Sequence, residues 1–243
     1  MIGIVDYNAG NITSVEHALE YLKADYVLSK DPAELKNADK IVFPGVGDAA
    51  YAMEQLKATG FDEFLKEFHA SGKPMIGICL GSQIVFDYSE EGGVDCLGLI
   101  PGKICHFSDL LKERVDTEEG MRVLQKIPHM GWNEVEVCNG GSRLLDGVAN
   151  HSDFYFVHSY VIQPEDPSVI KGYADYGMMV PAVVEKDNLT VFQFHPEKSG
   201  AAGLKILENF ELVYSNTDLE IPDLVHILLI LLHNKYNLDH NHT

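Results

Sequence analysis

The segment Pro74-Met75-Ile76-Gly77-Ile78-Cys79-Leu80-Gly81-Ser82-Gln83 decides how the rest of the chain is interpreted. Its first half is a short apolar run, which is typical of a buried strand. The pattern glycine-x-Cys79-x-glycine follows, and the apolar residues in 83–86 predict a helix directly after it. A side chain at such a sharp strand-to-helix turn is exposed, and small flanking residues let the neighbouring backbone approach closely. A cysteine at a helix N-terminus also gains thiolate character, so the segment predicts Cys79 as a nucleophile.

The stretches on either side of this turn alternate between strand and helix patterns. We expect strands at residues 3–5, 40–43, 74–78, 153–157, 182–184 and 189–194, and helices at 13–22, 49–56, 61–68 and 201–214. This rhythm predicts an α/β fold around a largely parallel central sheet. The charged stretch 107–125 predicts a surface excursion, and we find neither an internal repeat nor a clear second domain.

Length and charge limit the possible functions. The 243 residues, 46% of them hydrophobic, suit one globular domain with a sizeable core. Eighteen Lys and Arg against 37 Asp and Glu give a formal net charge of −19. Such a surface repels a phosphate backbone, which argues against nucleic acid as a partner. The charge favours solubility or a basic protein partner.

The sequence also predicts a cytoplasmic protein with no metal and no cofactor. The start of the chain resembles a strand and not a signal peptide, and the apolar run 227–232 is far shorter than the roughly 20 residues of a membrane-spanning helix. The four cysteines (Cys79, Cys96, Cys105 and Cys138) form no CxxC pair, which favours reduced thiols. The late histidines (His226, His233, His240 and His242) lack the spacing and the carboxylate support of a metal site.

A cysteine nucleophile needs a base, and the base needs an orienting group. The segment Phe192-Gln193-Phe194-His195-Pro196-Glu197 offers both. If it continues in extended form, His195 and Glu197 point to the same side and line up with Cys79. His158, which follows an apolar strand, is a second candidate for the base.

An oxyanion formed during acyl transfer needs backbone N–H donors. The N–H of Leu80, directly after the nucleophile, is one natural donor. The loop Phe43-Pro44-Gly45-Val46-Gly47 ends a predicted strand, and α/β sheets bind their ligands at the carboxyl ends of their strands. We therefore expect this loop to belong to the site as well.

With these residues in place, the chain resembles the class I glutamine amidotransferases. Within that family it is most similar to the glutaminase subunits of imidazole glycerol phosphate synthase. The resemblance covers about residues 1–215 and rests on ordered motifs. These are Asp6-Tyr7-Asn8-Ala9-Gly10-Asn11, Pro44-Gly45-Val46-Gly47, Gly77-Ile78-Cys79-Leu80-Gly81-Ser82-Gln83, Pro128-His129-Met130-Gly131-Trp132-Asn133, Tyr155-Phe156-Val157-His158-Ser159-Tyr160 and Phe194-His195-Pro196-Glu197-Lys198-Ser199.

The resemblance implies a flavodoxin-like open sheet and hydrolysis of glutamine through a thioester. It implies a catalytic triad of Cys79, His195 and Glu197. It places Val46 and Leu80 at the oxyanion, Gly47, Gln83, Glu91, Ser159 and Tyr160 around glutamine, and Asn11, His129, Trp132, Tyr155 and Lys198 at a (β/α)₈ cyclase subunit. In that heterodimer the ammonia passes to the cyclase, which makes imidazole glycerol phosphate for histidine biosynthesis.

Two segments depart from the family pattern. The stretch 108–126 is longer than expected, and the residues after about 216 are extra. We therefore divide the chain into an amidotransferase domain, 1–215, and a C-terminal extension, 216–243. In the extension, Pro222 and an apolar stripe at helical spacing predict a helix with a polar, frayed end. The departures leave open a paralogous glutaminase that supplies ammonia to another pathway, such as amidino-sugar synthesis.

Three further functions stay open at this point. A glutaminase of the anthranilate or GMP synthase type shares the nucleophile turn and His195-Pro196-Glu197, but is not expected to carry the Pro128–Asn133 motif. A cysteine hydrolase or peptidase of the same fold differs in its substrate. A non-catalytic binding subunit is the third hypothesis, and the intact Cys79, His195 and Glu197 argue against it.

Overall fold

The computed structural model of the chain describes residues 1–8, 12–112 and 126–213. These residues belong to one unit, Met1–Val213. Three predictions concern residues outside the described ones: the role of Asn11, most of the 108–126 stretch, and the helix expected in 216–243. Those predictions stay untested.

The described elements follow one another in an alternating order. The helices are α1 Ile12–Leu22, α2 Pro32–Leu35, α3 Ala49–Thr59, α4 Phe61–Ala70, α5 Leu80–Gln83, α6 Phe107–Lys112 and α7 Gly200–Val213, with 3-10 turns η1 Arg143–Leu145, η2 Pro167–Val169 and η3 Pro196–Lys198. The strands are β1 Ile2–Val5, β2 Tyr26–Ser29, β3 Lys40–Gly45, β4 Met75–Cys79, β5 Tyr88–Ser89, β6 Val94–Asp95, β7 Gly102–His106, β8 His129–Val137, β9 Ser152–His158, β10 Tyr160–Pro164, β11 Ile170–Asp175, β12 Met179–Lys186 and β13 Leu189–Phe192.

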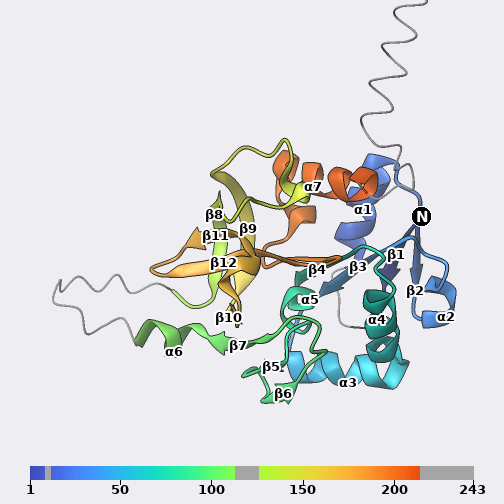
Figure 1. The fold of residues 1–243 in the computed structure, drawn as a ribbon, viewed down its shortest axis with the longest axis horizontal. Helices are drawn as coiled ribbons and strands as arrows, with labels where there is room; N and C mark the ends of the chain where they lie inside the picture. Colours follow the sequence, from blue (N-terminus) through green and yellow to red (C-terminus); the bar gives the residue numbers. More distant parts are fainter. Residues whose placement is uncertain (9–11, 113–125, 214–243) are drawn as a thin grey trace, which may run out of the picture. The chain divides into compact units, whose positions relative to one another are not determined.

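The central sheet of the described chain has the strand order β2-β1-β3-β4-β13-β12-β11-β8-β9 (Figure 1). Pairing is parallel from β2 to β13, as the βαβ rhythm predicts. From β13 to β9 every pair is antiparallel, so the sheet is parallel in only one half. The expectation of a largely parallel sheet is therefore corrected, because the second half of the chain returns through hairpins and not through crossover helices.

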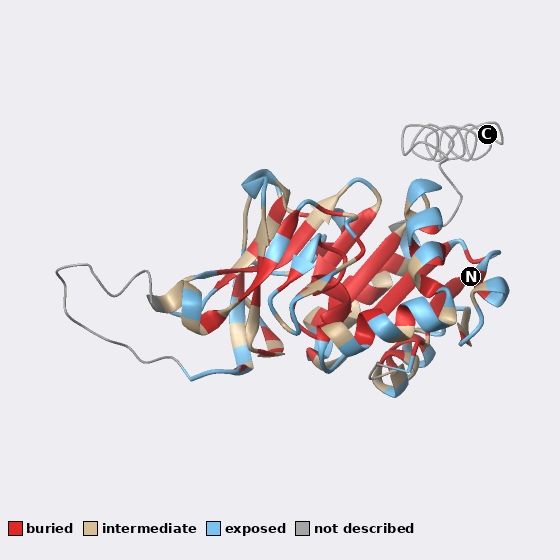
Figure 2. Ribbon diagram, turned by 90° about the horizontal axis from the view of Figure 1, so that it is seen from below, coloured by how far each residue is buried: buried red, intermediate tan, exposed pale blue. Residues whose placement is uncertain are grey.

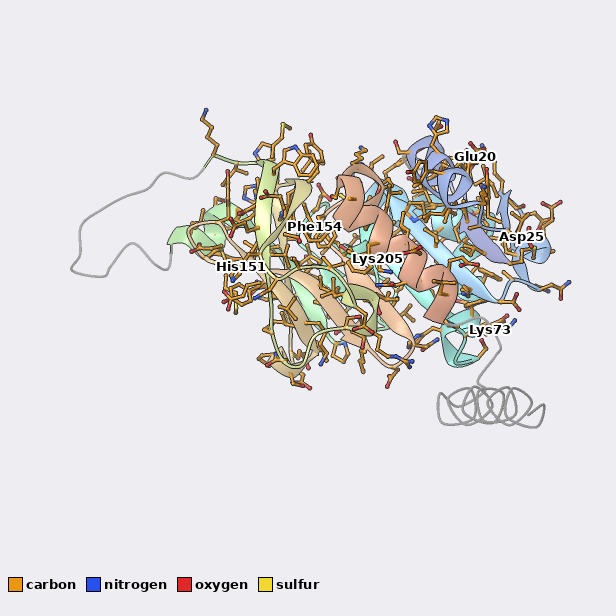
Figure 3. The ribbon with its side chains drawn as sticks, turned by 90° about the horizontal axis from the view of Figure 1, so that it is seen from above. Glu20, Asp25, Lys73, His151, Phe154 and Lys205 are labelled. Atoms are coloured by element: carbon orange, nitrogen blue, oxygen red, sulfur yellow. The ribbon has the colours of Figure 1, made fainter. Side chains whose placement is uncertain are left out.

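Helices cover both faces of the parallel half of the sheet. Helices α1 and α7 contact each other on one face, and α3 and α4 pack together on the other (Figure 1). Helix α4 buries Phe61, Phe64, Leu65 and Phe68, the spacing of one helical face. Helix α7 also contacts β9, the strand that carries Phe154 (Figure 3). Burial is accordingly concentrated on the strands, with exposed residues along the outer sides of the helices (Figure 2).

Local sequence signals set the ends of these helices. The Asp48 carboxylate accepts a hydrogen bond from the N–H of Tyr51 at 2.9 Å and caps α3. Gly60, with φ of 77°, ends that helix in the left-handed conformation, which glycine adopts without steric cost. Because only Val46 and Gly47 separate β3 from Asp48, this cap also fixes the end of the 45–47 loop.

Three expectations about the elements were wrong. The helix after Cys79 is only four residues long and ends at Gln83. The strand expected at 189–194 ends at Phe192, and a 3-10 turn begins at Pro196. Phe107, expected on a surface excursion, is fully buried.

A second sheet, in the order β10-β7-β5-β6, has no counterpart in the sequence-based prediction. Its strands β5 and β6 have two residues each, which is too short for a periodic pattern to identify them. Strand β10 starts at Tyr160, two residues after β9 ends. The short connection between the two sheets therefore consists of Ser159, one of the predicted substrate-binding residues.

Candidate active site

The turn that presents Cys79 depends on Gly77 and Gly81, which lie two residues before and two residues after it. Cys79 ends β4 with φ of 55° and ψ of −110°, a strained conformation for a residue with a side chain. A Cβ atom on Gly77 would lie 2.7 Å from the carbonyl oxygen of Gly81, and one on Gly81 would overlap the carbonyl oxygen of Phe43. The predicted turn is therefore present, and its two glycines are required by close backbone contacts.

The helix after Cys79 contributes less to the position and charge of the thiol than the sequence predicted. Helix α5 is a single turn, and the full dipole expected from a longer helix is absent at this position. The sulfur of Cys79 lies 3.9 Å from the carbonyl oxygen of Val157, and the side chain is buried with 7% exposure. The strained turn, rather than the helix, places the sulfur at the pocket.

His195 and Glu197 form a buried pair. Nδ1 of His195 lies 2.7 Å from Oε1 of Glu197, and the two side chains are 2% and 1% exposed. Strand alternation is not the reason for this contact, because η3 bends the chain back at Pro196. The hydroxyl of Ser199 donates to the His195 carbonyl at 2.6 Å and holds that bend. Since the carboxylate occupies Nδ1, the other ring nitrogen is free for chemistry.

The charge state of His195 is set by its neighbours. Burial alone lowers the pKa of His195, but the nearby Cys79 sulfur and the Glu197 carboxylate outweigh it and raise the pKa to about 9. Nε2 of His195 is buried and has no hydrogen-bond partner among the described residues. An imidazole with these properties holds a proton at neutral pH and can transfer it to a group that enters the pocket.

A pocket of about 430 Å³ opens beside the Cys79 sulfur. It is lined by Val46, Gly47, Cys79, Leu80, Gln83, Glu91, Pro128, Val157, His158, Ser159 and Tyr160. The fold therefore brings the nucleophile together with both predicted oxyanion residues and all five predicted substrate-binding residues. Pro128 and Val157 were not singled out from the sequence, although both lie in the motifs quoted for the resemblance.

The loop 45–47 approaches the nucleophile through the sheet. Gly45 is the register partner of Cys79 in the parallel β3–β4 pair. A Cβ on Gly45 would lie 2.6 Å from the Tyr7 hydroxyl and 2.7 Å from the N atom of Gly81. Gly47, with φ of 101°, has open space around it. The loop is thus tightly held at its first glycine and unobstructed at its last.

Two polar side chains, Gln83 and Glu91, line the pocket. Gln83 is buried, and its Nε2 donates to the Tyr160 carbonyl at 3.1 Å and to Oε1 of Gln193 at 2.9 Å. Glu91 accepts a hydrogen bond from the N–H of Ala49 at 3.1 Å, and burial raises its pKa. Both groups are fixed by the fold, so they can recognise a polar ligand without first being ordered.

The residues predicted to contact a partner subunit differ in exposure. Trp132 is 58% exposed and lies edge-on to Tyr155, with ring centroids 6.1 Å apart. Tyr155 and Lys198 are half-buried. His129 is 2% exposed, so its side chain is not available on this surface, and a partner would meet only its backbone or its neighbours. Its predicted role stays untested.

The described residues contain neither a cluster of metal ligands nor a membrane-spanning helix. No group of three or more His, Cys, Asp or Glu side chains in residues 1–8, 12–112 and 126–213 is arranged to hold a metal ion. Within the same residues, no helix is both long and apolar enough to cross a bilayer.

Comparison with known families identifies the chain. The model of the family described as glutamine amidotransferase class-I matches residues 3–213. The chain belongs to the class I glutamine amidotransferase family. The sequence-based recognition and fold class are therefore confirmed.

Curated relatives place this amidotransferase more narrowly. The imidazole glycerol phosphate synthase subunit HisH of Herpetosiphon aurantiacus is 42% identical over 211 residues, which is 86% of this chain and 93% of the relative. The proteins of the same name from a Geobacillus species and from Methanocaldococcus jannaschii are 46% and 43% identical over the same length, which is 95% and 98% of those relatives.

Solved structures share the fold at much lower identity. A glutamine amidotransferase superimposes with a TM-score of 0.62 at 14% identity, covering 86% of this chain and 97% of that one. PurLQS from Thermotoga maritima gives a TM-score of 0.58 at 19% identity, covering 86% and 95%. At this identity the likeness supports the amidotransferase fold alone.

Proposed function

We propose that this amidotransferase hydrolyses glutamine at Cys79 and delivers the ammonia to a cyclase subunit that makes imidazole glycerol phosphate in histidine biosynthesis. One observation carries the proposal. The strained turn places Cys79 in the pocket that contains the predicted glutamine-binding residues, and the Cys79 sulfur is near enough to the buried His195–Glu197 pair, bonded at 2.7 Å, to raise the pKa of His195.

The proposed reaction has two steps. The thiol proton of Cys79 is held on Nε2 of His195, whose pKa is raised to about 9, and the Cys79 sulfur attacks the side-chain amide carbon of glutamine. Collapse of the tetrahedral intermediate breaks the C–N bond, and His195 returns the proton to the departing ammonia. Water then attacks the thioester with His195 as base, the C–S bond breaks, and glutamate leaves. Glu197 orients the imidazole throughout and does not itself transfer the proton.

The pocket wall supplies the remaining groups of this proposal. The N–H groups of Val46 and Leu80 stabilise the oxyanion. Gly47, Gln83, Glu91, Ser159 and Tyr160 hold the glutamine. Glu91 is the natural partner of the substrate ammonium group, since it is an acidic side chain that remains half-buried in the pocket wall.

The cyclase partner is proposed to dock over Trp132, Tyr155 and Lys198. The exposed indole of Trp132 is the kind of side chain that anchors protein interfaces. The relatives named as subunits of imidazole glycerol phosphate synthase support this partner over the anthranilate and GMP types. A location in the cytoplasm and a (β/α)₈ fold for the partner stay predictions from the sequence.

The test compares two nitrogen sources in the complete complex. Cys79→Ala removes the nucleophile, so glutamine-dependent product formation should fall by at least about a thousandfold. Ammonia-dependent formation of imidazole glycerol phosphate should remain, because the cyclase chemistry lies on the partner. Glutamine hydrolysis that stays within about tenfold of wild type would refute this mechanism. If the wild-type complex hydrolyses glutamine but forms no imidazole glycerol phosphate from it, the chain serves another pathway.

A further inference from the structure

The buried histidines His129 and His158 are bonded to each other behind the pocket wall. Nδ1 of His129 lies 3.1 Å from Nε2 of His158, and both side chains are buried. The two residues are register partners in the antiparallel β8–β9 pair. Their contact is therefore built into the sheet and does not depend on a loop.

The pair belongs to a longer chain of hydrogen bonds. Nδ1 of His158 lies 2.7 Å from the carbonyl oxygen of Tyr160. At the other end, Nε2 of His129 lies 3.2 Å from Nδ2 of Asn133, which also donates to the carbonyl of Asp175 at 2.9 Å. This series of hydrogen bonds thus runs from the half-buried amide of Asn133 on β8 to the carbonyl of Tyr160 in the pocket wall.

The partners at the two ends fix the direction of every bond. A carbonyl oxygen only accepts, so His158 carries its proton on Nδ1 and presents the lone pair of Nε2. His129 must then donate from Nδ1, and its own Nε2 accepts from the amide of Asn133. Both rings are neutral Nδ1–H tautomers in this arrangement, and all their nitrogen atoms have partners.

The surroundings of the two rings favour the neutral state. His129 is stacked between Phe156 and Tyr176, with ring centroids 4.5 and 3.9 Å away. Burial lowers the pKa of His129 to about 4 and that of His158 to about 3. The nearby charge of His195 also lowers the pKa of His158.

The Tyr160 carbonyl at the end of the chain holds a second group in the site. It accepts a hydrogen bond from Nε2 of Gln83 at 3.1 Å, in addition to the one from His158. His158 itself lines the pocket, together with Ser159 and Tyr160. Any shift of the histidine pair therefore moves the 158–160 wall and the amide of Gln83.

We propose that His129 and His158 are positioning residues, which hold the 158–160 wall and Gln83 in the geometry that binds glutamine and connect that wall to Asn133 beside the exposed Trp132. The inference rests on the proposed function, because that proposal assigns the pocket to glutamine. His158 serves here as a neutral strut in the wall and not as the catalytic base for which the sequence made it a candidate.

The first experiment measures the tautomers directly. Nitrogen NMR of the full-length protein with ¹⁵N-labelled histidine, at neutral pH, should show protonated Nδ1 and unprotonated Nε2 for both residues. Free imidazole side chains prefer the other tautomer, so the result is diagnostic. A protonated Nε2 on either ring, or an imidazolium, would contradict the proposed series of hydrogen bonds. This measurement does not depend on activity, so it distinguishes failure of the proposed hydrogen-bond series from failure of the proposed function.

The second experiment separates hydrogen bonding from packing. His129→Phe keeps an aromatic ring between Phe156 and Tyr176 but donates nothing to His158. We expect the KM for glutamine in the complex to rise about tenfold, the effect of one neutral hydrogen bond, with a smaller change in kcat. His129→Asn retains an N–H near the position of Nδ1 and should recover most of this loss. Ammonia-dependent product formation should be unchanged in both.

Two outcomes would contradict the positioning role. In one, His129→Phe has a wild-type KM and only a lower melting temperature. In the other, the Asn and Phe variants are equally impaired, which would mean that ring shape alone matters. If the Phe variant does not fold, Asn133→Leu takes its place, because at a half-buried position it removes the amide that donates to His129 and to the Asp175 carbonyl. A smaller rise in KM is then expected, and an unchanged KM overturns the proposal.

Discussion

The two ends of the parallel strands differ in how their polar groups are satisfied. At the carboxyl ends, beyond β1, β4 and β13, lie the strained Cys79 and several buried polar atoms that have no hydrogen-bond partner in the described chain. These atoms are Oη of Tyr7, Nε2 of Gln193, Nε2 of His195 and Oε2 of Glu197.

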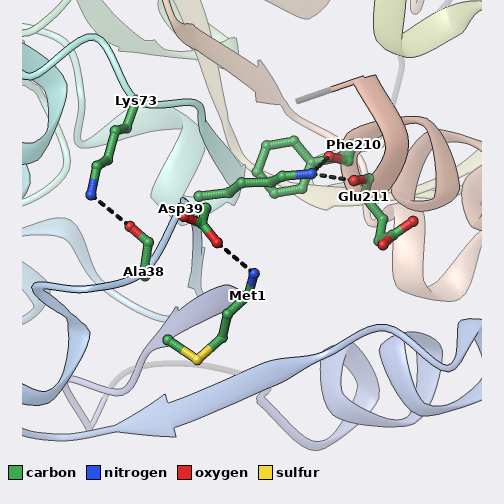
Figure 4. Close-up of polar contacts among 7 residues, drawn as sticks. Met1, Ala38, Asp39, Lys73, Phe210 and Glu211 are labelled. Carbon is green, nitrogen blue, oxygen red and sulfur yellow. Dashed lines mark hydrogen bonds and ion pairs between the residues drawn. The ribbon is translucent and has the colours of Figure 1, made fainter. Parts of the chain in front are cut away.

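At the amino ends of the same strands, the charged groups are paired, and a single buried polar atom, Nδ1 of His69, has no hydrogen-bond partner among the described residues. The amino group of Met1 lies 2.7 Å from the Asp39 carboxylate, and Nζ of Lys73 donates to the Ala38 carbonyl at 2.9 Å (Figure 4). Nζ of Lys40, a residue only 3% exposed, donates to the carbonyls of Phe210 and Glu211 at the end of α7. This end of the sheet ties helices and strands together.

The difference separates a binding end from a stabilising end. A buried polar atom without a partner costs about 1–3 kcal/mol, so the gathering of four such atoms at one end of the sheet points to a use for them there. At the carboxyl ends a substrate can supply the missing partners. Changes at the carboxyl ends should therefore reduce activity whether or not they also lower stability, and changes at the amino ends should lower stability and leave activity intact.

The largest effect on activity short of the nucleophile itself is expected for Glu197→Gln. The amide keeps the shape of the side chain but no longer stabilises an imidazolium or selects the Nδ1–H tautomer of His195. We expect kcat for glutamine hydrolysis to fall by about 10²–10⁴, with some activity left because His195 remains. Steady-state kinetics of the complex measure this, and a change below about threefold would remove Glu197 from the mechanism.

The same variant makes a prediction about pH. The pKa of His195 is raised from 6.5 to about 9 in the folded protein, so the folded state binds a proton more tightly than the unfolded state. This contribution to stability is complete below about pH 6.5 and disappears as the pH rises through 9. Denaturant unfolding of wild type and Glu197→Gln should therefore show a difference that shrinks between pH 6 and pH 10. A difference that grows with pH would contradict the assignment.

A smaller but sharper effect is expected at the nucleophile turn. In Gly81→Ala, the new methyl group would overlap the carbonyl of Phe43, so the turn must open. We expect the unfolding free energy to fall by about 1–3 kcal/mol. Most of the glutaminase activity should also be lost. Gly72→Ala is the matched control, because Gly72 has φ of 77° but open space around it. It should cost about 1–2 kcal/mol from backbone strain and leave activity intact.

The carboxyl-end site was largely predictable because its constraints are local in sequence. Gly77, Cys79 and Gly81 need each other within one turn, and His195 meets Glu197 two residues away. The route of that second contact was predicted wrongly, since Pro196 starts a 3-10 turn and the strand pattern gives no sign of it. The contact survives because both geometries bring residues two apart within reach.

The antiparallel half of the sheet was much less predictable. The His129–His158 contact depends on the register of β8 against β9, and no local pattern in either strand specifies a partner 29 residues away. His129 was accordingly assigned to a surface, although the β8 alternation turns Trp132 outward and His129 inward. The small second sheet was not predicted for the same reason. Its strands β5 and β6 have two residues each and are defined by pairing alone.

The smallest effect tests the stabilising end with two lysines that make the same kinds of contact. Nζ of Lys40 lies 5.8 Å from the ring centroid of Phe210, and Nζ of Lys73 lies 5.4 Å from that of Phe68. Each also donates to a backbone carbonyl, but Lys40 is buried and Lys73 is half-buried. The two lysines thus differ in burial and in the number of carbonyls that they bind, two for Lys40 and one for Lys73.

Methionine at either position keeps the apolar stem and removes the charge and the donor. Lys40→Met should lower the unfolding free energy by about 1–3 kcal/mol, because water cannot replace a lost donor inside the protein. Lys73→Met should cost less than about 1 kcal/mol, since solvent reaches that carbonyl. Glutamine hydrolysis by the folded variants should match wild type, as both lysines lie at the far ends of β3 and β4 from Cys79. Denaturant unfolding curves and activity assays of both variants test these expectations. Equal losses of stability would show that burial does not set the value of these contacts, and a loss of activity in folded Lys40→Met would remove the distinction between the two ends of the sheet.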